Sequence, residues 1–252
     1  MSNFIWYDLM TPDMVASSEF YAHVVGWTIK DSGMPGMTYS VISANGIDVG
    51  GIMPIPPSSE GMPACWNGYI YSSEVDKDAE RANELGGKIY QPGMDIPGVG
   101  RFAVLGDPSG AAFIIFKPNS NESPTKVPDG TPGHVGWREL MSADWQKDFD
   151  FYAAMFGWRK TEAMDMGPMG IYQLFDMGNG QSGGMMNKTP QDPAPPHWNY
   201  YINVDSIAAG VARAKSKGAT FFMEPMEVPG GGFATSGMDP QGAAFSLFSS
   251  AK

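Results

Sequence analysis

Cysteine and histidine are scarce in this sequence. Its 252 residues include one cysteine, Cys65, and three histidines, His23, His134 and His197. A single cysteine excludes an internal disulfide framework and a zinc site built from thiolates. The histidines are far apart in the sequence and form no metal-ligand motif.

Positive charge and long apolar runs are also lacking. Lys and Arg number 16 against 27 Asp and Glu, which leaves a formal net charge of −11. This balance argues against a nucleic-acid partner, because phosphate binding needs clustered basic residues. No apolar run reaches the roughly 18 residues that a membrane span needs, so we expect no membrane partner. The N-terminus, MSNFIWYDLM, has no basic segment and no apolar segment, which predicts a cytoplasmic protein without a secretion signal.

Three blocks of the sequence occur twice, in the same order and at a nearly constant offset of 131 or 132 residues. The pairs are FYAHVVGW (20–27) with FYAAMFGW (151–158), WNGYI (66–70) with WNYYI (198–202), and GDPSGAAFIIF (106–116) with MDPQGAAFSLF (238–248). Such self-similarity indicates a duplicated domain. We predict one domain over 1–117, a Pro- and Ser-rich linker over 118–132, and a second domain over 133–252.

Within each half, the pattern reads β-α-β-β-β twice. A short β-rich run leads into a helix, which we expect Thr11 and Pro12 to open in the first half and Ser142 in the second. A second helix is expected at about 74–85 and again at about 206–217, each ending at glycine. Short strands follow, and the last one comes after a DPxG turn. The fold class is therefore α+β, with four βαβββ modules and helices on one face of a curved sheet.

These blocks together resemble the glyoxalase/bleomycin-resistance/extradiol-dioxygenase superfamily, also called the vicinal oxygen chelate fold. The resemblance rests on FYxxxxGW in the first helix, GG at the end of the first module, Trp-Asn opening the second, and DPxGAxF before the last strand. The resemblance covers nearly the whole chain outside the linker. The sequence is similar to those of tandem bacterial glyoxalase-like proteins. It implies two tandem domains whose curved sheets form incomplete barrels, with the helices outside and a cavity on each concave face.

The resemblance also implies four positions per half at which many family members hold a divalent metal. Counting from the shared blocks places them at Trp6, Gly51, Asn67 and Ile114, and at Trp137, Gly184, Asn199 and Ser246. None of these residues is His, Glu or Asp. The departure predicts a protein that binds no metal at these positions, and we expect no other cofactor.

Strand alternation adds a carboxylate to each candidate site. Side chains two apart share one face of a strand, so Trp6 brings Asp8 and Trp137 brings Glu139. An acid facing an apolar cavity suggests recognition of a cationic or hydrogen-donating ligand, or general-base chemistry. The alternative is a structural acid that caps a backbone amide or meets Arg101 or Arg138.

The remaining candidate ligand-binding residues follow from the same alternation. Asn67 and Asn199 can orient a carbonyl or hydroxyl group, or can be structural residues at a strand start. The others could form walls of the cavities or pack in the core, and they are Tyr69, Ile114, Phe116, Tyr201, Ser246 and Phe248.

The prediction is a metal-independent protein that binds a small, partly apolar molecule in aromatic-lined cavities, by sequestration or by conversion. Its rivals are a metal-dependent lyase or dioxygenase with ligands elsewhere, and a non-enzymatic antigen or interaction protein. We expect an intramolecular pseudo-dimer, compatible with a monomer, whose small-molecule sites differ. If Arg101 neutralises Asp8, the site with Glu139 keeps its free charge and is the better candidate for the working site. If Arg101 instead neutralises Glu139, the site with Asp8 is the better candidate.

Overall fold

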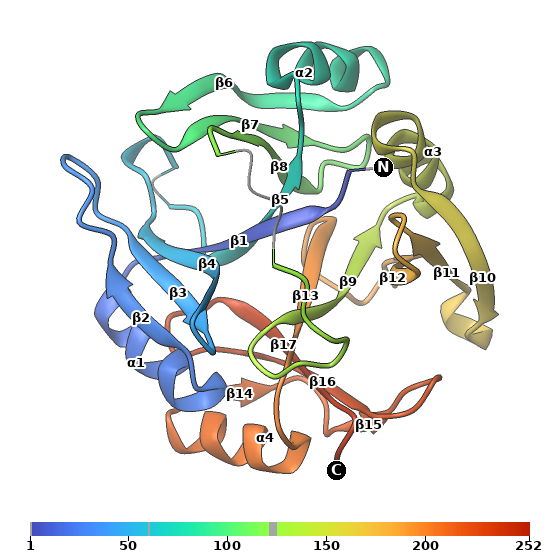
Figure 1. Cartoon of the computed structure of the whole chain (residues 1–252). Helices are drawn as coiled ribbons and strands as arrows, with labels where there is room; N and C mark the ends of the chain where they lie inside the picture. Colours follow the sequence, from blue (N-terminus) through green and yellow to red (C-terminus); the bar gives the residue numbers. More distant parts are fainter. Residues whose placement is uncertain (1, 60, 121–124) are drawn as a thin grey trace. The chain divides into compact units, whose positions relative to one another are not determined.

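The structure is a computed structural model that describes residues 2–59, 61–120 and 125–252 (Figure 1). Its first half contains β1 (Phe4–Thr11), α1 (Met14–Val25), β2 (Thr28–Asp31), β3 (Ser40–Ala44), β4 (Ile47–Pro54), β5 (Cys65–Tyr71), α2 (Val75–Glu84), β6 (Lys88–Ile96), β7 (Gly100–Gly106) and β8 (Ala112–Pro118). The second half contains β9 (Val135–Ser142), α3 (Trp145–Phe156), β10 (Arg159–Asp165), β11 (Ile171–Asp176), β12 (Gln181–Asn187), β13 (His197–Asn203), α4 (Ile207–Ser216), β14 (Thr220–Phe221), β15 (Met226–Glu227), β16 (Phe233–Met238) and β17 (Ala244–Ser249).

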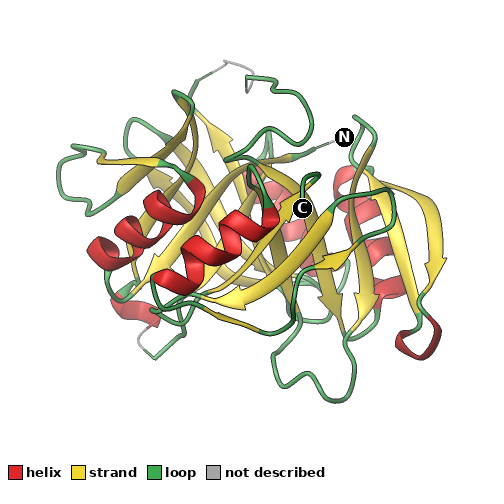
Figure 2. Ribbon diagram, turned by 90° about the horizontal axis from the view of Figure 1, so that it is seen from below, coloured by secondary structure: helices red, strands yellow, loops and turns green. Residues whose placement is uncertain are grey.

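This order confirms the α+β class and the four βαβββ modules, and Figure 2 shows helices and strands as separate stretches. In the last module β14 and β15 both pair with β16, so two short strands stand where the other modules have one. The strand orders are β2-β3-β4-β1-β5-β8-β7-β6 and β10-β11-β12-β9-β13-β17-β16-β14. Over the described ranges neither order closes on itself, as expected of incomplete barrels. No described helix is long and apolar enough to cross a bilayer.

The first helix of each half begins two residues later than we expected. Asp13, not Thr11, caps α1 by accepting a hydrogen bond from the amide of Ala16 at 3.0 Å. Asp144, not Ser142, caps α3 in the same way. Aspartate is a better N-cap than threonine, and the hydroxyls of Thr11 and Ser142 have buried partners instead.

Backbone contacts group the chain into two compact units. Unit 1 comprises Met1–Trp6, Gly68–Pro124 and Trp137–Asn199, and unit 2 comprises Tyr7–Asn67, Thr125–Gly136 and Tyr200–Lys252. Each unit therefore draws residues from both halves of the sequence. The predicted division into a first domain over 1–117, a linker over 118–132 and a second domain over 133–252 stays a prediction.

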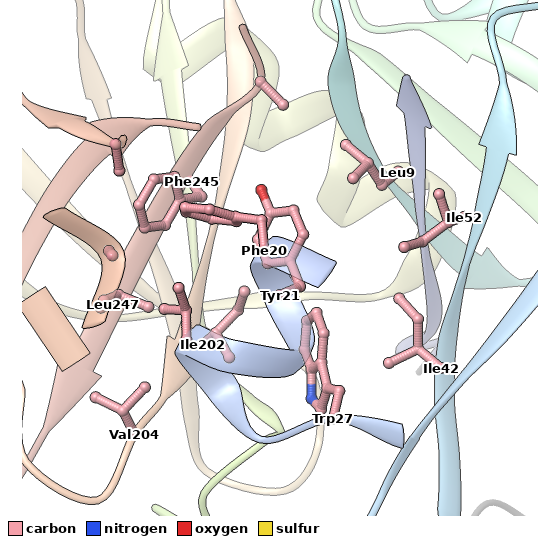
Figure 3. Close-up of a cluster of buried hydrophobic side chains, with 14 of the residues drawn as sticks. Leu9, Phe20, Tyr21, Trp27, Ile42, Ile52, Ile202, Val204, Phe245 and Leu247 are labelled. Carbon is pink, nitrogen blue, oxygen red and sulfur yellow. The ribbon is translucent and has the colours of Figure 1, made fainter. Parts of the chain in front are cut away.

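The core of unit 2 is built around α1. Phe20 and Tyr21 of this helix lie next to Phe245 of β17, with the Phe20 and Phe245 rings 5.6 Å apart (Figure 3). Leu9 and Ile52 of the first module complete the same buried cluster. This apolar burial is the main stabilising term, at about 25 cal/mol per Å² removed from water.

The core of unit 1 is a stack of aromatic rings. Trp158 lies between Tyr152 and Phe175, with ring centroids 5.0 and 4.9 Å apart and nearly parallel planes. Phe113 of β8 packs against Tyr152 at 5.3 Å. Both cores therefore join the first helix of one half to the last strand of the other half.

A chain of three hydrogen-bonded side chains recurs in both units. In unit 2 the indole of Trp66 donates to the Tyr21 hydroxyl at 3.0 Å, and this hydroxyl donates to Asp239 at 3.0 Å. In unit 1 the corresponding distances are 2.9 Å from Trp198 to Tyr152 and 3.2 Å from Tyr152 to Asp107. Each Trp directly precedes a candidate asparagine, so this chain fixes the strand that carries Asn67 or Asn199.

The two hydrogen-bonded Trp–Tyr–Asp groups have different surroundings at their aspartate ends. In unit 1 Ser142 donates to the carboxylate of Asp148, which also accepts from the backbone amide of Ser109 at 3.1 Å. Asp107 and Asp148 are both 0% exposed. Burial, together with the charge of Asp148, raises the pKa of Asp107 to about 7, and burial raises the pKa of Asp148 as well.

The neutral residues Thr11, Ser17 and Gln241 form the corresponding group in unit 2. The Thr11 and Ser17 hydroxyls are 2.8 Å apart, and Ser17 donates to Gln241 at 3.5 Å. Burial raises the pKa of Asp239 there as well. Unit 2 therefore buries one carboxyl group where unit 1 buries two.

Candidate functional site

The inner strand of the first module presents Trp6 and Asp8 on one face. Tyr7 and Leu9, which alternate with them, lie in buried cores. Asp8 stands opposite Gly51 in the parallel pairing of β1 and β4. The face of β1 opposite to that of Leu9 therefore carries the predicted acid, next to one of the glycines.

A tyrosine ring lies over this glycine. A Cβ atom added to Gly51 would overlap the hydroxyl end of Tyr39, and that hydroxyl donates to the Asp8 carboxylate at 2.7 Å. Asp8 is 3% exposed. Glycine is thus required at position 51 for Tyr39 to reach the acid.

The third module repeats the arrangement in unit 1. Gly184 stands opposite Glu139 in the pairing of β12 and β9, and a Cβ atom at Gly184 would overlap the ring of Tyr172. The indole of Trp137 donates to the Tyr172 hydroxyl at 2.8 Å. A tyrosine, a glycine and a Trp-x-acid strand therefore recur in both halves. The tyrosine hydroxyl bonds to the acid in the first half and to the indole in the second.

The two asparagines have different partners. In unit 1 the Asn199 amide donates to the Glu139 carboxylate at 3.4 Å, and both side chains are half-buried. In unit 2 the buried Asn67 amide donates to the Cys65 sulfur at 3.4 Å. Burial raises the pKa of the Cys65 thiol, which keeps it protonated near neutral pH.

The other predicted residues lie on the last strands. Tyr69 contacts Phe116 edge to face at 5.9 Å and stands opposite Ile114 in the strand pairing. In unit 2 Tyr201 stands opposite Ser246. The Ser246 hydroxyl is buried and lies 2.8 Å from that of Ser236, whereas half-buried Phe248 packs over Gly232.

The alternative in which Arg101 neutralises Asp8 or Glu139 is wrong. Its guanidinium contacts Asp76 at 2.7 and 2.9 Å and Asp95 at 2.9 Å. Asp95 stands directly opposite Arg101 in the β6–β7 hairpin, so its carboxylate is within easy reach of the guanidinium. The Arg101 hydrogen bonds lower the pKa of Asp76.

The tyrosines were missed by our reading of the sequence. Tyr39 and Tyr172 are 133 residues apart, as are Gly51 and Gly184. This shared offset is the signal that could have linked each tyrosine to its glycine. The histidines do not join either group: His197, for example, contacts the carbonyl oxygen of Pro195 at 2.8 Å.

The residues at the positions that the resemblance implies do not fit the family's metal. Trp, Gly, Asn and Ile or Ser offer neither the carboxylate nor the imidazole donors that such a metal needs. The rings of Tyr39 and Tyr172 fill the space that a longer side chain at either glycine would need. Within the described part of the chain, no group of three or more His, Cys, Asp or Glu could hold a metal ion. We therefore derive no chemical step through a metal.

Comparison with known proteins settles the family. The sequence profile of the Glyoxalase/Bleomycin resistance protein/Dioxygenase superfamily matches residues 3–115 and again 131–247. The chain belongs to this superfamily. Both copies of the repeat are thus superfamily domains, as the repeated sequence blocks suggested.

Two relatives cover almost the whole chain. A protein named as a candidate glyoxylase, CFP32 of Mycobacterium tuberculosis, is 34% identical over 245 residues, 96% of this chain and 92% of its own length. The anthracycline biosynthesis protein DnrV of Streptomyces peucetius is 32% identical over 256 residues, covering 96% and 91%.

Solved structures of the superfamily share the fold. The Mn(II)-bound glyoxalase from Novosphingobium aromaticivorans has a TM-score of 0.69 at 17% identity, covering all of this chain and 84% of its own. The 2,3-dioxygenase LapB from Pseudomonas sp. KL28 has a TM-score of 0.65 at 11% identity, covering 100% and 92%.

Proposed function

We propose that this superfamily member binds a small, partly apolar molecule at its glycine–tyrosine clusters without using a metal. These clusters are Asp8, Tyr39 and Gly51 in unit 2, and Trp137, Glu139, Tyr172, Gly184 and Asn199 in unit 1. The observation that carries the proposal is the tyrosine ring over each glycine, at the positions where the family resemblance implies a metal ligand.

The chemistry of the clusters suits an amphipathic ligand. Indole and phenol rings provide apolar contact area, while a carboxylate, an amide and a hydroxyl group provide hydrogen bonds that fix orientation. The names of the two relatives, a candidate glyoxylase and a protein of anthracycline biosynthesis, support a small organic molecule as the ligand. The bound molecule is either sequestered or converted, and its recovery unchanged after incubation would favour sequestration.

The proposal is tested by titrating the protein with 1-naphthol and following tryptophan fluorescence. We expect saturable binding that Gly184→Val weakens at least tenfold, because the new side chain must displace Tyr172. Tyr172→Phe keeps the ring but removes the hydroxyl, so it should weaken binding less. Ala163→Val on solvent-facing β10 adds a similar side chain outside the cluster and should leave the affinity unchanged.

Two results would count against the proposal. The first is the absence of saturable 1-naphthol binding. The second is binding that both Gly184→Val and Tyr172→Phe leave at the wild-type affinity. Either result would instead favour the rival hypothesis, a metal-dependent lyase or dioxygenase whose metal ligands lie elsewhere in the chain.

A further inference from the structure

The two cluster carboxylates differ in how a ligand could reach them. Asp8 is 3% exposed, and the Tyr39 hydroxyl donates to it at 2.7 Å. Glu139 is half-buried, and the Asn199 amide donates to its carboxylate at 3.4 Å. A ligand must therefore displace Tyr39 to meet Asp8, whereas part of the Glu139 side chain already faces solvent.

Aromatic rings surround Glu139 on the same face of the sheet. Trp137 is two residues before it on β9, so both side chains point to one side. The Tyr172 ring lies over Gly184, which stands opposite Glu139, and its hydroxyl bonds to the Trp137 indole at 2.8 Å. All these residues belong to unit 1.

We propose that the Glu139 cluster binds a planar aromatic molecule carrying a positive charge. The inference rests on the proposed function and adds the chemical class of the ligand and the cluster that takes it. A carboxylate beside indole and phenol faces attracts a cation through its charge and through cation–π contacts. The net charge of −11 favours the approach of such a ligand, while the Asn199 amide oxygen can accept a hydrogen bond from it.

The experiment compares three probes of similar shape in about 0.15 M salt, which screens long-range attraction. N-methylquinolinium is cationic, 1-methylnaphthalene is neutral and 1-naphthoate is anionic. We expect the cation to bind roughly five to thirty times more tightly than the neutral probe and the anion to bind least well. Glu139→Gln should remove the preference for the cation while keeping the affinity for the neutral probe.

Two variants control for total charge, because each removes one negative charge elsewhere. Glu80→Gln and Glu84→Gln each change an exposed carboxylate on α2, outside both clusters. Both should keep the cation preference. The wild-type comparison of the three probes needs no variant, so it stands even if one variant fails to fold.

The outcomes separate this inference from the proposed function. If the neutral probe and 1-naphthol bind but the cation has no advantage, the ligand class is wrong while the proposed function stands. A cation preference that Glu80→Gln or Glu84→Gln abolishes as fully as Glu139→Gln would overturn the assignment to Glu139. If none of the probes binds, both proposals fail.

Discussion

Units 1 and 2 use the same Trp–Tyr–Asp chain but differ in buried charge. Asp107 in unit 1 shares its surroundings with Asp148, whereas the position corresponding to Asp148 in unit 2 is Ser17, hydrogen-bonded to Thr11. Two buried carboxyl groups that repel each other do not both ionise easily near neutral pH. The comparison teaches that duplication preserved the hydrogen-bond geometry while the charge at one end of it changed.

Introducing the second acid into unit 2 gives the largest expected effect. Ser17→Asp places a carboxylate in a fully buried position whose hydrogen-bond partners, Thr11 and Gln241, are neutral. We expect a loss of roughly 2–4 kcal/mol in the free energy of unfolding at pH 7. Urea unfolding followed by circular dichroism measures it. Unchanged urea midpoints would show that unit 2 tolerates the charge, and that the difference in buried carboxyl groups between the units does not affect stability.

The pH dependence of stability should come from unit 1. A carboxyl group whose folded pKa is raised binds its proton more tightly when folded, so its stabilising effect is complete below about pH 4 and is lost as the pH rises toward 7. We expect the free energy of unfolding to fall as the pH rises over that range, because the folded protein then loses the proton on this group.

Asp148→Ser supplies the matched control, because it gives unit 1 the residue of unit 2. It removes the charge that helps to raise the Asp107 pKa, so the urea midpoint should change less between pH 5 and pH 8 than in the wild type. An equal slope in the two proteins would contradict the assignment of this pH dependence to the carboxyl pair.

Self-comparison of the sequence was enough to predict the modules and the face that the Trp-x-acid strands present. It could not predict the Tyr39 contact, because Tyr39 lies just outside β3 and its reach depends on the register of three strands. The helix starts were misplaced because Thr11 and Ser142 are good caps in isolation but bond to Ser17 and Asp148 in the fold. Such partners depend on tertiary packing.

Removing Arg101 should have the smallest effect. Its ion pairs with Asp76 and Asp95 lie at the surface, where solvent screens them. We expect Arg101→Gln to leave 1-naphthol affinity unchanged and to shift the urea midpoint less than the Ser17 variant. A clear loss of ligand binding would instead connect Arg101 to the candidate site.

The central claim, that the glycine–tyrosine clusters bind ligand without a metal, has one direct test. The Kd for 1-naphthol is measured on chelator-treated protein and again after adding Mn(II), Fe(II) or Zn(II), with metal content determined in each sample. The account predicts the same Kd in every sample. Binding that disappears on chelation and returns with one metal ion per site would contradict it.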